Sequence, residues 1–331
     1  MRVTTYDIAE MCEVSQATVD RALNNRSSIK AETKEKILRV AQEMGYRPNS
    51  LPTYLKTGST KSIGVILPKP DLFYAELIAR FTKICKLYGY HVCISFSDFN
   101  VELEKEYLAE FLSANMDGII IFPVKDDGNE IKKIIDSGIP VVTLIRRIKN
   151  YNFDFVSSNY SHISKQAIEY LINLGHKNIC YFTIWDTSAN LYTYNERLHG
   201  YKNALTQNNI PVDYRFIIND TDDYQIIREL LRSDNRPTAF FCFNDLNAIG
   251  LVSFLNSLHF QVPNDFSVIS FDNLDMLKYF NPGLTSISYP YDDMCAKAVE
   301  ILLNKIRNQS TETHSYIFDA HLVIRGSCKM L

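Results

Sequence analysis

The sequence predicts an α/β protein in which a small all-helical N-terminal unit precedes a larger core built on parallel sheets. Two observations support this prediction. The first sixty residues contain helical patterns and no strand-like run, whereas from Ser62 onward short β-rich runs alternate with longer amphipathic segments. Strict alternation of this kind is typical of parallel strands covered by their connecting helices. The chain has 331 residues, which at about 100–200 residues per domain favours two or three domains.

The first expected helix begins after Thr4. Thr4 and Asp7 have the spacing of a capping box, in which the threonine hydroxyl accepts a hydrogen bond from a free helix N–H. We expect its apolar side chains to face the interior: Tyr6, Ile8, Ala9 and Met11.

A second helix is expected from Gln16 to about Leu23, with Ser15 as its N-cap. Its buried positions are expected to be Val19, Ala22 and Leu23. A third helix is expected from about Glu32 to Met44. Its apolar face consists of Ile37, Leu38, Val40, Ala41 and Met44, with Gly45 placed as its C-terminal cap and Lys30 as a weak N-cap.

Two short helices joined by a tight turn and braced by a third form a helix-turn-helix arrangement. The second helix would lie in the major groove of DNA, with its N-terminal residues nearest the base edges. The outward side chains there are Gln16, Ala17, Thr18 and Arg21. Gln and Arg can contact adenine and guanine through paired hydrogen bonds, and a methyl group can pack on thymine. The alternative, a solvated face of an ordinary helical hairpin, stays open on the periodicity alone.

The core from Ser62 onward contains seven runs that we expect to be strands buried on both faces. They are SIGVILP, HVCISFS, DGIIIFP, IPVVTLI, NICYFTI, TAFFCFN and FSVISFD. About ten β-α units are long for one sheet, so we expect two similar subdomains. Ligands of such sheets bind beyond the C-terminal ends of the strands, so the expected ligand site is the cleft between the subdomains.

Several classes of protein fit this composition poorly. Seven cysteines are scattered without a CxxC pair, which favours reduced thiols and no zinc site. No apolar run has the length of a signal peptide or of a membrane helix, so we expect an intracellular protein that does not enter the membrane. Phosphate-loop, GxSxG and HExxH motifs are absent, so we expect no enzyme, no metal and no cofactor. A solute-binding protein would fit the core but has no use for the N-terminal unit.

An ordered series of blocks resembles the LacI/GalR family of bacterial transcription regulators. The blocks include YDIAEMCEVSQATVDRALNN, ETKEKILRVAQEMGYRPNSLPTYLKTGSTKSIGVILP, LINLGHKNICYF, ERLHGYKNAL, PTAFFCFNDLNAIG, VPNDFSVISFDN and LVIRGS. The resemblance implies a DNA-binding headpiece over 1–47, a hinge helix over 48–60 and an effector-binding, dimerising core over 61–331. The core is expected to resemble periplasmic sugar-binding proteins, with subdomains at about 61–158 plus 288–317 and 159–287 plus 318–331.

The resemblance also implies partners and a location. These are near-palindromic double-stranded operator DNA, a small sugar or sugar derivative as effector, and a second copy of the chain. The location is the bacterial cytoplasm, at the nucleoid. Because the chain ends just after LVIRGS, with no room for a leucine-repeat tail, a homodimer is favoured over a tetramer.

The residues that the resemblance assigns to DNA are Thr4, Tyr6, Ser15, Gln16, Ala17, Thr18, Arg21, Asn24, Asn49, Leu55 and Lys56. Leu55 would wedge into a minor-groove step, and a hinge helix too short to be stable alone would fold on binding. Pro52 falls in the first turn of that helix, where its missing N–H costs little. Thr53 and Asp20 stand where the family commonly has a basic residue and a serine, so the family's usual operator preference cannot be carried over to this sequence.

The residues that the resemblance assigns to the effector are Phe73, Tyr74, Arg146, Asn159, Thr193, Arg197, Tyr224, Asn244 and Asp272. Several have an alternative role. Phe73 and Tyr74 could be core, Asn244 and Asp272 could cap helices, and Arg197 could be a solvated surface residue. Asp245 is interpreted as a helix cap. Ile145 and Ser158 replace two acidic residues of many relatives, which predicts a more positive pocket and an anionic sugar, or one with fewer recognised hydroxyls.

Overall fold

The computed structural model describes residues 3–23, 29–46, 58–184, 192–219, 224–308, 310 and 312–331. The chain divides into two compact units, Met1–Thr60 and Lys61–Leu331. Each unit has a hydrophobic core of its own.

The N-terminal unit consists of α1 (Thr5–Cys12), α2 (Gln16–Leu23) and α3 (Ala31–Glu43). Its core is formed by the buried faces of these helices: Ile8, Ala9, Cys12, Val19, Ala22, Ile37 and Ala41. The predicted capping box is confirmed. The Asp7 amide donates to the Thr4 hydroxyl at 3.4 Å, and the Asp7 carboxylate accepts from the Thr4 amide at 2.7 Å.

The predicted inward positions of these helices are partly wrong. Tyr6 and Met11 are both 65% exposed, and Leu38 is 43% exposed. Ile8, Ala9 and Cys12 occupy one arc of α1, and the other two apolar residues lie on either side of it. An eight-residue helix covered by only two neighbours buries a narrow stripe, so its remaining apolar side chains stay at the surface.

Gly45 ends α3 as expected. Its φ is +65°, a left-handed conformation that glycine adopts without steric cost. The Gly45 amide donates to Gln42 O at 3.0 Å and the Tyr46 amide to Ala41 O at 2.8 Å, which satisfies carbonyls of the last turn. Lys30 makes no side-chain capping bond at the other end, as expected for this residue type.

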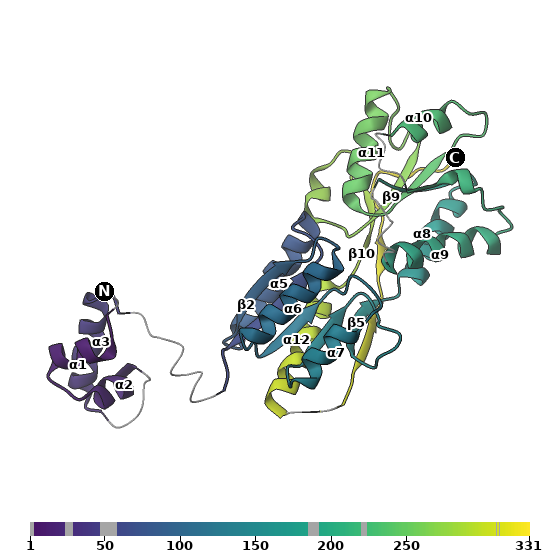
Figure 1. Cartoon of the computed structure of the whole chain (residues 1–331). Helices are drawn as coiled ribbons and strands as arrows, with labels where there is room; N and C mark the ends of the chain where they lie inside the picture. The colour runs from purple at the N-terminus through teal and green to yellow at the C-terminus, as the bar shows by residue number, and fades with distance from the viewer. Residues whose placement is uncertain are drawn as a thin grey trace. The chain divides into compact units, whose positions relative to one another are not determined.

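In the part of the chain that the structure describes, the second unit holds two six-stranded sheets (Figure 1). The first has the order β11-β5-β4-β3-β1-β2 and is parallel throughout. Its strands are β1 (Ser62–Leu67), β2 (His91–Phe96), β3 (Gly118–Ile121), β4 (Val141–Leu144), β5 (Asp154–Ser158) and β11 (Ser315–Phe318).

The second sheet has the order β12-β10-β9-β8-β6-β7 and is parallel except where β12 pairs with β10. Its strands are β6 (Ile179–Thr183), β7 (Ile217–Asn219), β8 (Ala239–Cys242), β9 (Ser267–Phe271), β10 (Thr285–Ser288) and β12 (His321–Val323).

Helices cover the sheets, as alternating parallel strands require. The first half of the unit contains α5 (Leu72–Leu87), α6 (Val101–Ser113), α7 (Asn129–Asp136) and α12 (Tyr291–Asn308). The second half contains α8 (Tyr160–Asn173), α9 (Tyr192–Gln207), α10 (Gln225–Leu231), α11 (Asp245–Ser257) and the 3-10 helices Tyr214–Phe216 and Asp275–Tyr279. Although α12 follows a strand of the second sheet, it packs on α5 and on β3, β4 and β5 of the first.

All seven predicted runs form strands, but one of them is not buried on both faces. Strand β2 is only partly covered because it lies at the edge of its sheet beside β1 alone. Five strands were not predicted: β5, β7, β10, β11 and β12. They have three to five residues each, and serine or threonine makes up much of β5 and β10.

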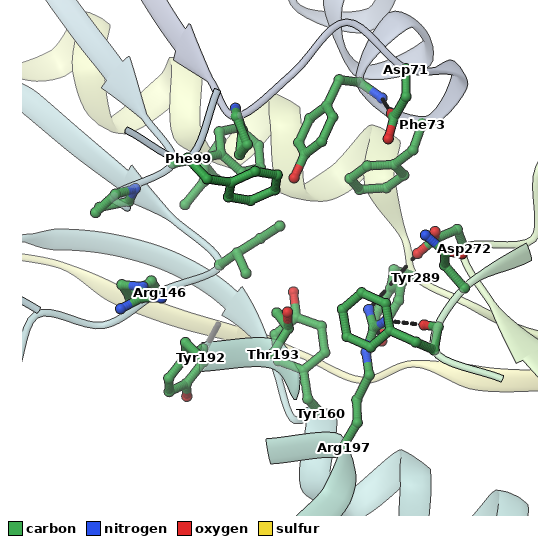
Figure 2. A pocket seen from close by; sticks show the side chains of 18 of the residues that line it. Asp71, Phe73, Phe99, Arg146, Tyr160, Tyr192, Thr193, Arg197, Asp272 and Tyr289 are labelled. Atoms are coloured by element: carbon green, nitrogen blue, oxygen red, sulfur yellow. Dashed lines mark hydrogen bonds and ion pairs between the residues drawn. The ribbon is translucent and has the colours of Figure 1, made fainter. Parts of the chain in front are cut away.

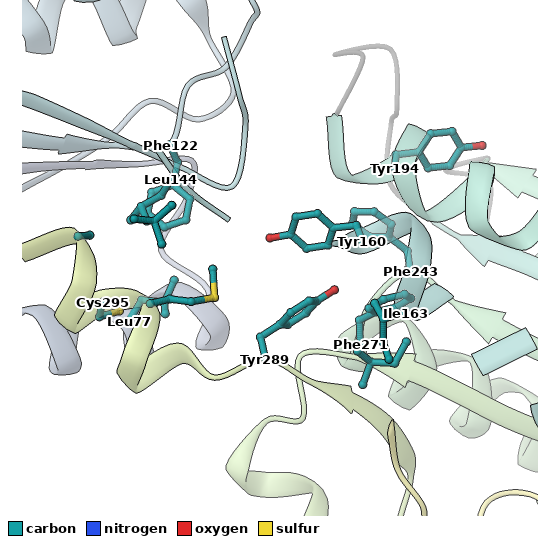
Figure 3. Close-up of a cluster of buried hydrophobic side chains, with 14 of the residues drawn as sticks. Leu77, Phe122, Leu144, Tyr160, Ile163, Tyr194, Phe243, Phe271, Tyr289 and Cys295 are labelled. Carbon is teal, nitrogen blue, oxygen red and sulfur yellow. The ribbon is translucent and has the colours of Figure 1, made fainter. Parts of the chain in front are cut away.

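The described chain passes between the two halves at three places: after β5, between β10 and α12, and between β11 and β12. The boundaries expected at 287/288 and 317/318 fall at the last residue of β10 and of β11. The Ser158 hydroxyl donates to Phe318 O at 2.7 Å, so two of these passages are bonded to each other. One hydrophobic cluster spans both halves, with Tyr289 between Leu144 of the first and Phe271 of the second (Figure 3).

We predict that Gly200→Ala destabilises the second unit by about 2 kcal/mol, a typical cost of overpacking. Gly200 lies on α9 against α8, where an added Cβ would meet Ser161 O at 2.2 Å and Ser164 Cβ at 2.6 Å. Urea unfolding measures the effect, with Gln207→Ala on the exposed face of α9 as the control. Equal stability of the two variants would show that the helices are not packed this closely.

Candidate DNA-reading helix and effector pocket

The leading end of α2 is fixed by polar contacts that leave its outer face open. The Thr18 amide donates to the Ser15 hydroxyl at 3.2 Å, and the two hydroxyls lie 2.9 Å apart. Gln16 Nε2 donates to Thr5 Oγ1 at 2.8 Å, which joins α2 to α1. Thr4, Tyr6, Ser15, Gln16, Ala17 and Arg21 are exposed, and Thr18 is half-buried. The helix therefore presents the side chains that the sequence assigned to base edges.

Four of the predicted DNA contacts, Asn24, Asn49, Leu55 and Lys56, lie outside the described residues, as do Pro52 and Thr53. Asp20 is described and exposed on α2, next to Arg21.

The core unit has a pocket where strands of both sheets end (Figure 2). Seven of the nine predicted effector residues line it: Phe73, Tyr74, Arg146, Thr193, Arg197, Asn244 and Asp272. The other described lining residues are Pro68, Asp71, Phe99, Phe122, Pro123, Val124, Leu144, Ile145, Tyr160, Tyr192, Phe243, Tyr289 and Tyr291. Nine of these twenty lining residues are aromatic, so flat apolar faces make up much of the wall.

Arg197 on α9 is the most enclosed charge of the pocket, with 5% of its surface exposed. Its guanidinium donates to Phe243 O and to the Tyr289 hydroxyl, the latter at 3.5 Å, and lies 3.8 Å from Asp272 Oδ1. It also stacks 4.0 Å from the centre of the Phe271 ring. Its Nε has no hydrogen-bond partner among the described residues. Burial lowers the pKa of Arg197, but the neighbouring groups together, Tyr289 and Asp272 first among them, raise it above its usual value, so the side chain stays charged.

Asp272 follows β9 and faces Arg197. Burial raises the pKa of its carboxyl to about 7, although Arg197 lowers it. The Tyr291 hydroxyl donates to Asp272 Oδ1 at 3.5 Å. The carboxylate thus has protein partners on two sides before any ligand is present.

Arg146 follows β4 on the opposite side of the pocket and is also paired. Its guanidinium donates to Asp126 Oδ1 at 3.1 Å. Burial lowers the pKa of Arg146, whereas Asp126 raises it. Next to it, the buried Glu104 accepts from the Val124 amide at 2.8 Å, and burial raises its pKa to about 7.

The described lining carries as many acidic as basic side chains, so it does not by itself favour the anionic sugar that was predicted. Two arginines, Arg146 and Arg197, are matched there by Asp71 and Asp272. Asp71 itself caps α5 through the Tyr74 amide at 3.1 Å. The sequence argument counted two lost acidic positions but could not see that carboxylates from other segments, Asp126 among them, lie against the arginines.

Asn244 and Asp245 begin α11 with different roles. Asn244 Oδ1 accepts from the Asn247 amide at 2.8 Å, so this residue caps the helix and also faces the pocket. Asp245 was interpreted as a cap, which is wrong. Its carboxylate is fully buried and accepts from the Ser286 hydroxyl and the Leu274 amide, each at 2.7 Å, which joins α11 to the second sheet.

Two predicted effector residues are not in the pocket lining. Asn159 is exposed and caps α8 by accepting from the His162 amide at 3.1 Å. Tyr224 stacks between Phe182 and Phe254, with ring centres 5.8 Å and 4.5 Å away, and so belongs to a hydrophobic cluster of the second half.

The sequence analysis missed most of the aromatic lining. Tyr289 and Tyr291 follow β10 and Tyr160 follows β5, but neither strand was predicted, so the position at a strand end was not visible. Phe122 and Phe243, in contrast, are the second-last residues of the predicted runs DGIIIFP and TAFFCFN, so that signal was available.

Among the described residues, no group of three or more His, Cys, Asp and Glu side chains is arranged to hold a metal ion. No described helix has both the length and the apolar character needed to cross a membrane.

Comparison with known proteins assigns the chain to a family. Residues 4–49 match the model for bacterial regulatory proteins of the lacI family, and residues 168–328 match a periplasmic binding protein-like domain. Catabolite control protein A of Priestia megaterium is 32% identical over 328 residues, which cover 98% of each protein. The chain belongs to the LacI family of bacterial transcription regulators. The family explains why a helix-turn-helix unit and a cleft-bearing core occur on one chain.

Solved structures agree with the fold of this regulator. A LacI family regulator from Enterococcus faecium with bound ribose matches with a TM-score of 0.72 at 27% identity, covering 82% of this chain and 99% of that one. The lac repressor dimer bound to operator and the anti-inducer ONPF matches with a TM-score of 0.84 at 24% identity, covering 99% and 100%.

We predict that Glu104→Gln removes part of the pH dependence of stability. The folded regulator holds the Glu104 proton more tightly than the unfolded chain, because the pKa rises from 4.5 to about 7. The stability of the wild type relative to this variant therefore falls as pH rises from about 4.5 through about 7. The change is about 3–4 kcal/mol, at about 1.4 kcal/mol per pKa unit for a rise from 4.5 to about 7.

Urea unfolding at several pH values measures this difference. Glutamine can still accept from the Val124 amide, so the variant keeps that hydrogen bond. Glu106→Gln is the control, because Glu106 is exposed on α6, the helix that also carries Glu104. A stability difference that does not change with pH would contradict the raised pKa.

Proposed function

We propose that this regulator is a repressor that binds operator DNA through α2 and whose operator affinity changes when a small effector fills the core pocket. The observation that carries the proposal is the polar, exposed leading face of α2 on the same chain as an enclosed pocket lined by aromatic rings and paired charges. The chain therefore has both a helix that can contact DNA and a pocket that can bind a small ligand.

The DNA contacts follow from the exposed face of α2. Gln16 and Arg21 would read base edges, while Ser15 and the Thr4–Asp7 cap hold the helix termini that approach the phosphates. We extend the site to the segment 48–60, where Leu55 and Lys56 would contact the minor groove once two copies pair. The lac repressor structure, which is a dimer bound to operator, supports DNA binding by two paired copies of the chain.

The effector is proposed to be a sugar or sugar derivative. The ring faces of Phe73, Tyr160 and Phe243 suit the CH faces of a sugar, and Arg197 and Asn244 offer donors for its hydroxyls. The ribose-bound regulator from Enterococcus faecium supports this class of ligand. We place the regulator in the bacterial cytoplasm, at the nucleoid, and assign it no catalytic activity.

We predict that Arg21→Ala weakens operator binding about tenfold or more, the expected loss of a paired contact to guanine. The operator is first selected from genomic fragments with the purified full chain, and fluorescence anisotropy then measures its affinity. Arg39→Ala is the matched control, since it removes another exposed arginine, from α3 of the same unit. Equal losses in the two variants would indicate a general charge effect and would reject α2 as the reader.

We also predict that Arg197→Ala blunts the effector response while ligand-free protein binds operator within a few-fold of the wild type. Because the change leaves Asp272 buried without its partner, its folding is checked by circular dichroism, and Arg197→Lys serves as a charge-preserving second variant. The control is Arg228→Ala, an arginine that stacks on Phe254 outside the pocket. A normal response in both Arg197 variants would show that the effector binds elsewhere.

A further inference from the structure

Two turns at the pocket hold large apolar side chains in a backbone conformation that favours glycine or asparagine. Phe99 follows β2 with a φ of +55°, and Ile145 follows β4 with a φ of +68°. Positive φ is uncommon for residues other than glycine, and for a bulky or β-branched residue it is a true outlier. Such strain persists only where the surroundings enforce it, and it gathers at functional sites.

The turn that carries Phe99 is closed at both ends. The Asn100 amide donates to Ser97 O at 2.8 Å, and both central residues, Asp98 and Phe99, have positive φ, the pattern of a type I′ turn. The Ser97 amide donates to Leu67 O at 2.8 Å, while Asn100 Oδ1 caps α6. The turn therefore cannot relax without loosening β1 or α6.

The turn that carries Ile145 is tighter still. The Arg146 amide donates to Leu144 O at 2.7 Å, which closes a three-residue turn with Ile145 at its centre. A turn of this kind with positive φ is rare and strained. The Ile145 amide donates to Val156 O at 2.9 Å, and Ile145 O accepts from the Ser157 hydroxyl at 2.7 Å. Both backbone groups are thus engaged, and the side chain packs on the hydrophobic cluster that spans both halves while also lining the pocket.

Both side chains are half-buried and line the pocket (Figure 2, Phe99). Phe99 is not among the half-buried side chains that pack on the hydrophobic clusters of the described part of the chain, so its ring serves the pocket rather than the core. Phe122 and Leu144 extend the same apolar wall. Polar lining residues of the second half come from other segments; they include Thr193, Arg197, Asn244 and Asp272.

We propose that Phe99 and Ile145 are specificity-determining residues that select an effector with a flat aromatic group, namely an aryl glycoside rather than a free sugar. This inference rests on the proposed effector site and names the ligand class of that site. A hydroxyl placed against this wall would lose its hydrogen bonds to water without replacement, whereas an aromatic ring would gain apolar contact. The sugar portion would lie toward Arg197 and Asn244.

Calorimetry on the full-length regulator tests the proposal with phenyl β-glycosides of glucose, galactose, mannose and xylose, each paired with its free sugar. We expect at least one phenyl glycoside to bind about tenfold or more tightly than its parent sugar. Phe99→Asn and Ile145→Asn should each remove most of that advantage, since asparagine tolerates positive φ but offers no apolar surface. A panel in which no phenyl glycoside exceeds its sugar overturns the proposal.

Thermal unfolding separates selection from a merely structural role. Phe99→Asn should melt at or above the wild-type temperature, because it relieves strain at a side chain outside the hydrophobic clusters, whereas Ile145→Asn also loses contact with the cluster and should melt somewhat lower while staying folded. His259→Asn is the matched control: His259 is exposed, has a φ of +65° and lies outside the pocket lining. It should leave phenyl glycoside affinity unchanged. Pocket variants that keep the aryl preference, or that unfold, contradict the inference.

The proposed function and this inference fail in different ways. A regulator that selects genomic operator fragments and changes its affinity for them when free sugars are added, but shows no aryl preference, contradicts only the inference. If the chain selects no operator fragment, with or without any glycoside, that result contradicts the proposed function.

Discussion

The constraint on which the core depends is that its two halves are joined three times within the described chain. The segments after β5, after β10 and after β11 pass between the sheets, and a hydrogen bond from Ser158 to Phe318 O links two of them. A hydrophobic cluster continues across the passage through Tyr289. Segments joined in this way can let the halves rotate but cannot let them separate, which is the geometry of hinge closure around a ligand.

The pocket lies at this junction, and its charges are balanced before a ligand arrives. Arg197 finds its partners in Phe243 and Asp272 of the second half and in Tyr289 of a passage segment. Aromatic and apolar side chains of the first half face them. A ligand can shift the relative position of the halves only by the difference in its affinity for the open and closed arrangements. Both halves supply aromatic rings and paired charges to the lining, and these contacts change with that position.

Much of the fold could be predicted from the sequence, and less of the site. Long apolar runs gave seven strands, and the caps at Thr4 and Gly45 gave helix ends, because these signals are local. Short strands rich in serine, such as β10, carry no such signal. Because β10 was not predicted, Tyr289 and Tyr291, which follow it, were not recognised as pocket residues. Asn159 and Tyr224 were placed by resemblance, but a cap on α8 and an aromatic stack hold them elsewhere. The strain at Phe99 and Ile145 depends on distant hydrogen bonds and cannot be read from the chain.

The central claim is that the core pocket and the DNA-reading unit share one equilibrium, and reciprocal linkage tests it most directly. Operator affinity is measured with and without saturating effector, and effector affinity with and without saturating operator. The account predicts that the two ratios are equal and differ from one by about fivefold or more. An effector that binds the pocket with the same affinity in free and operator-bound protein would contradict it.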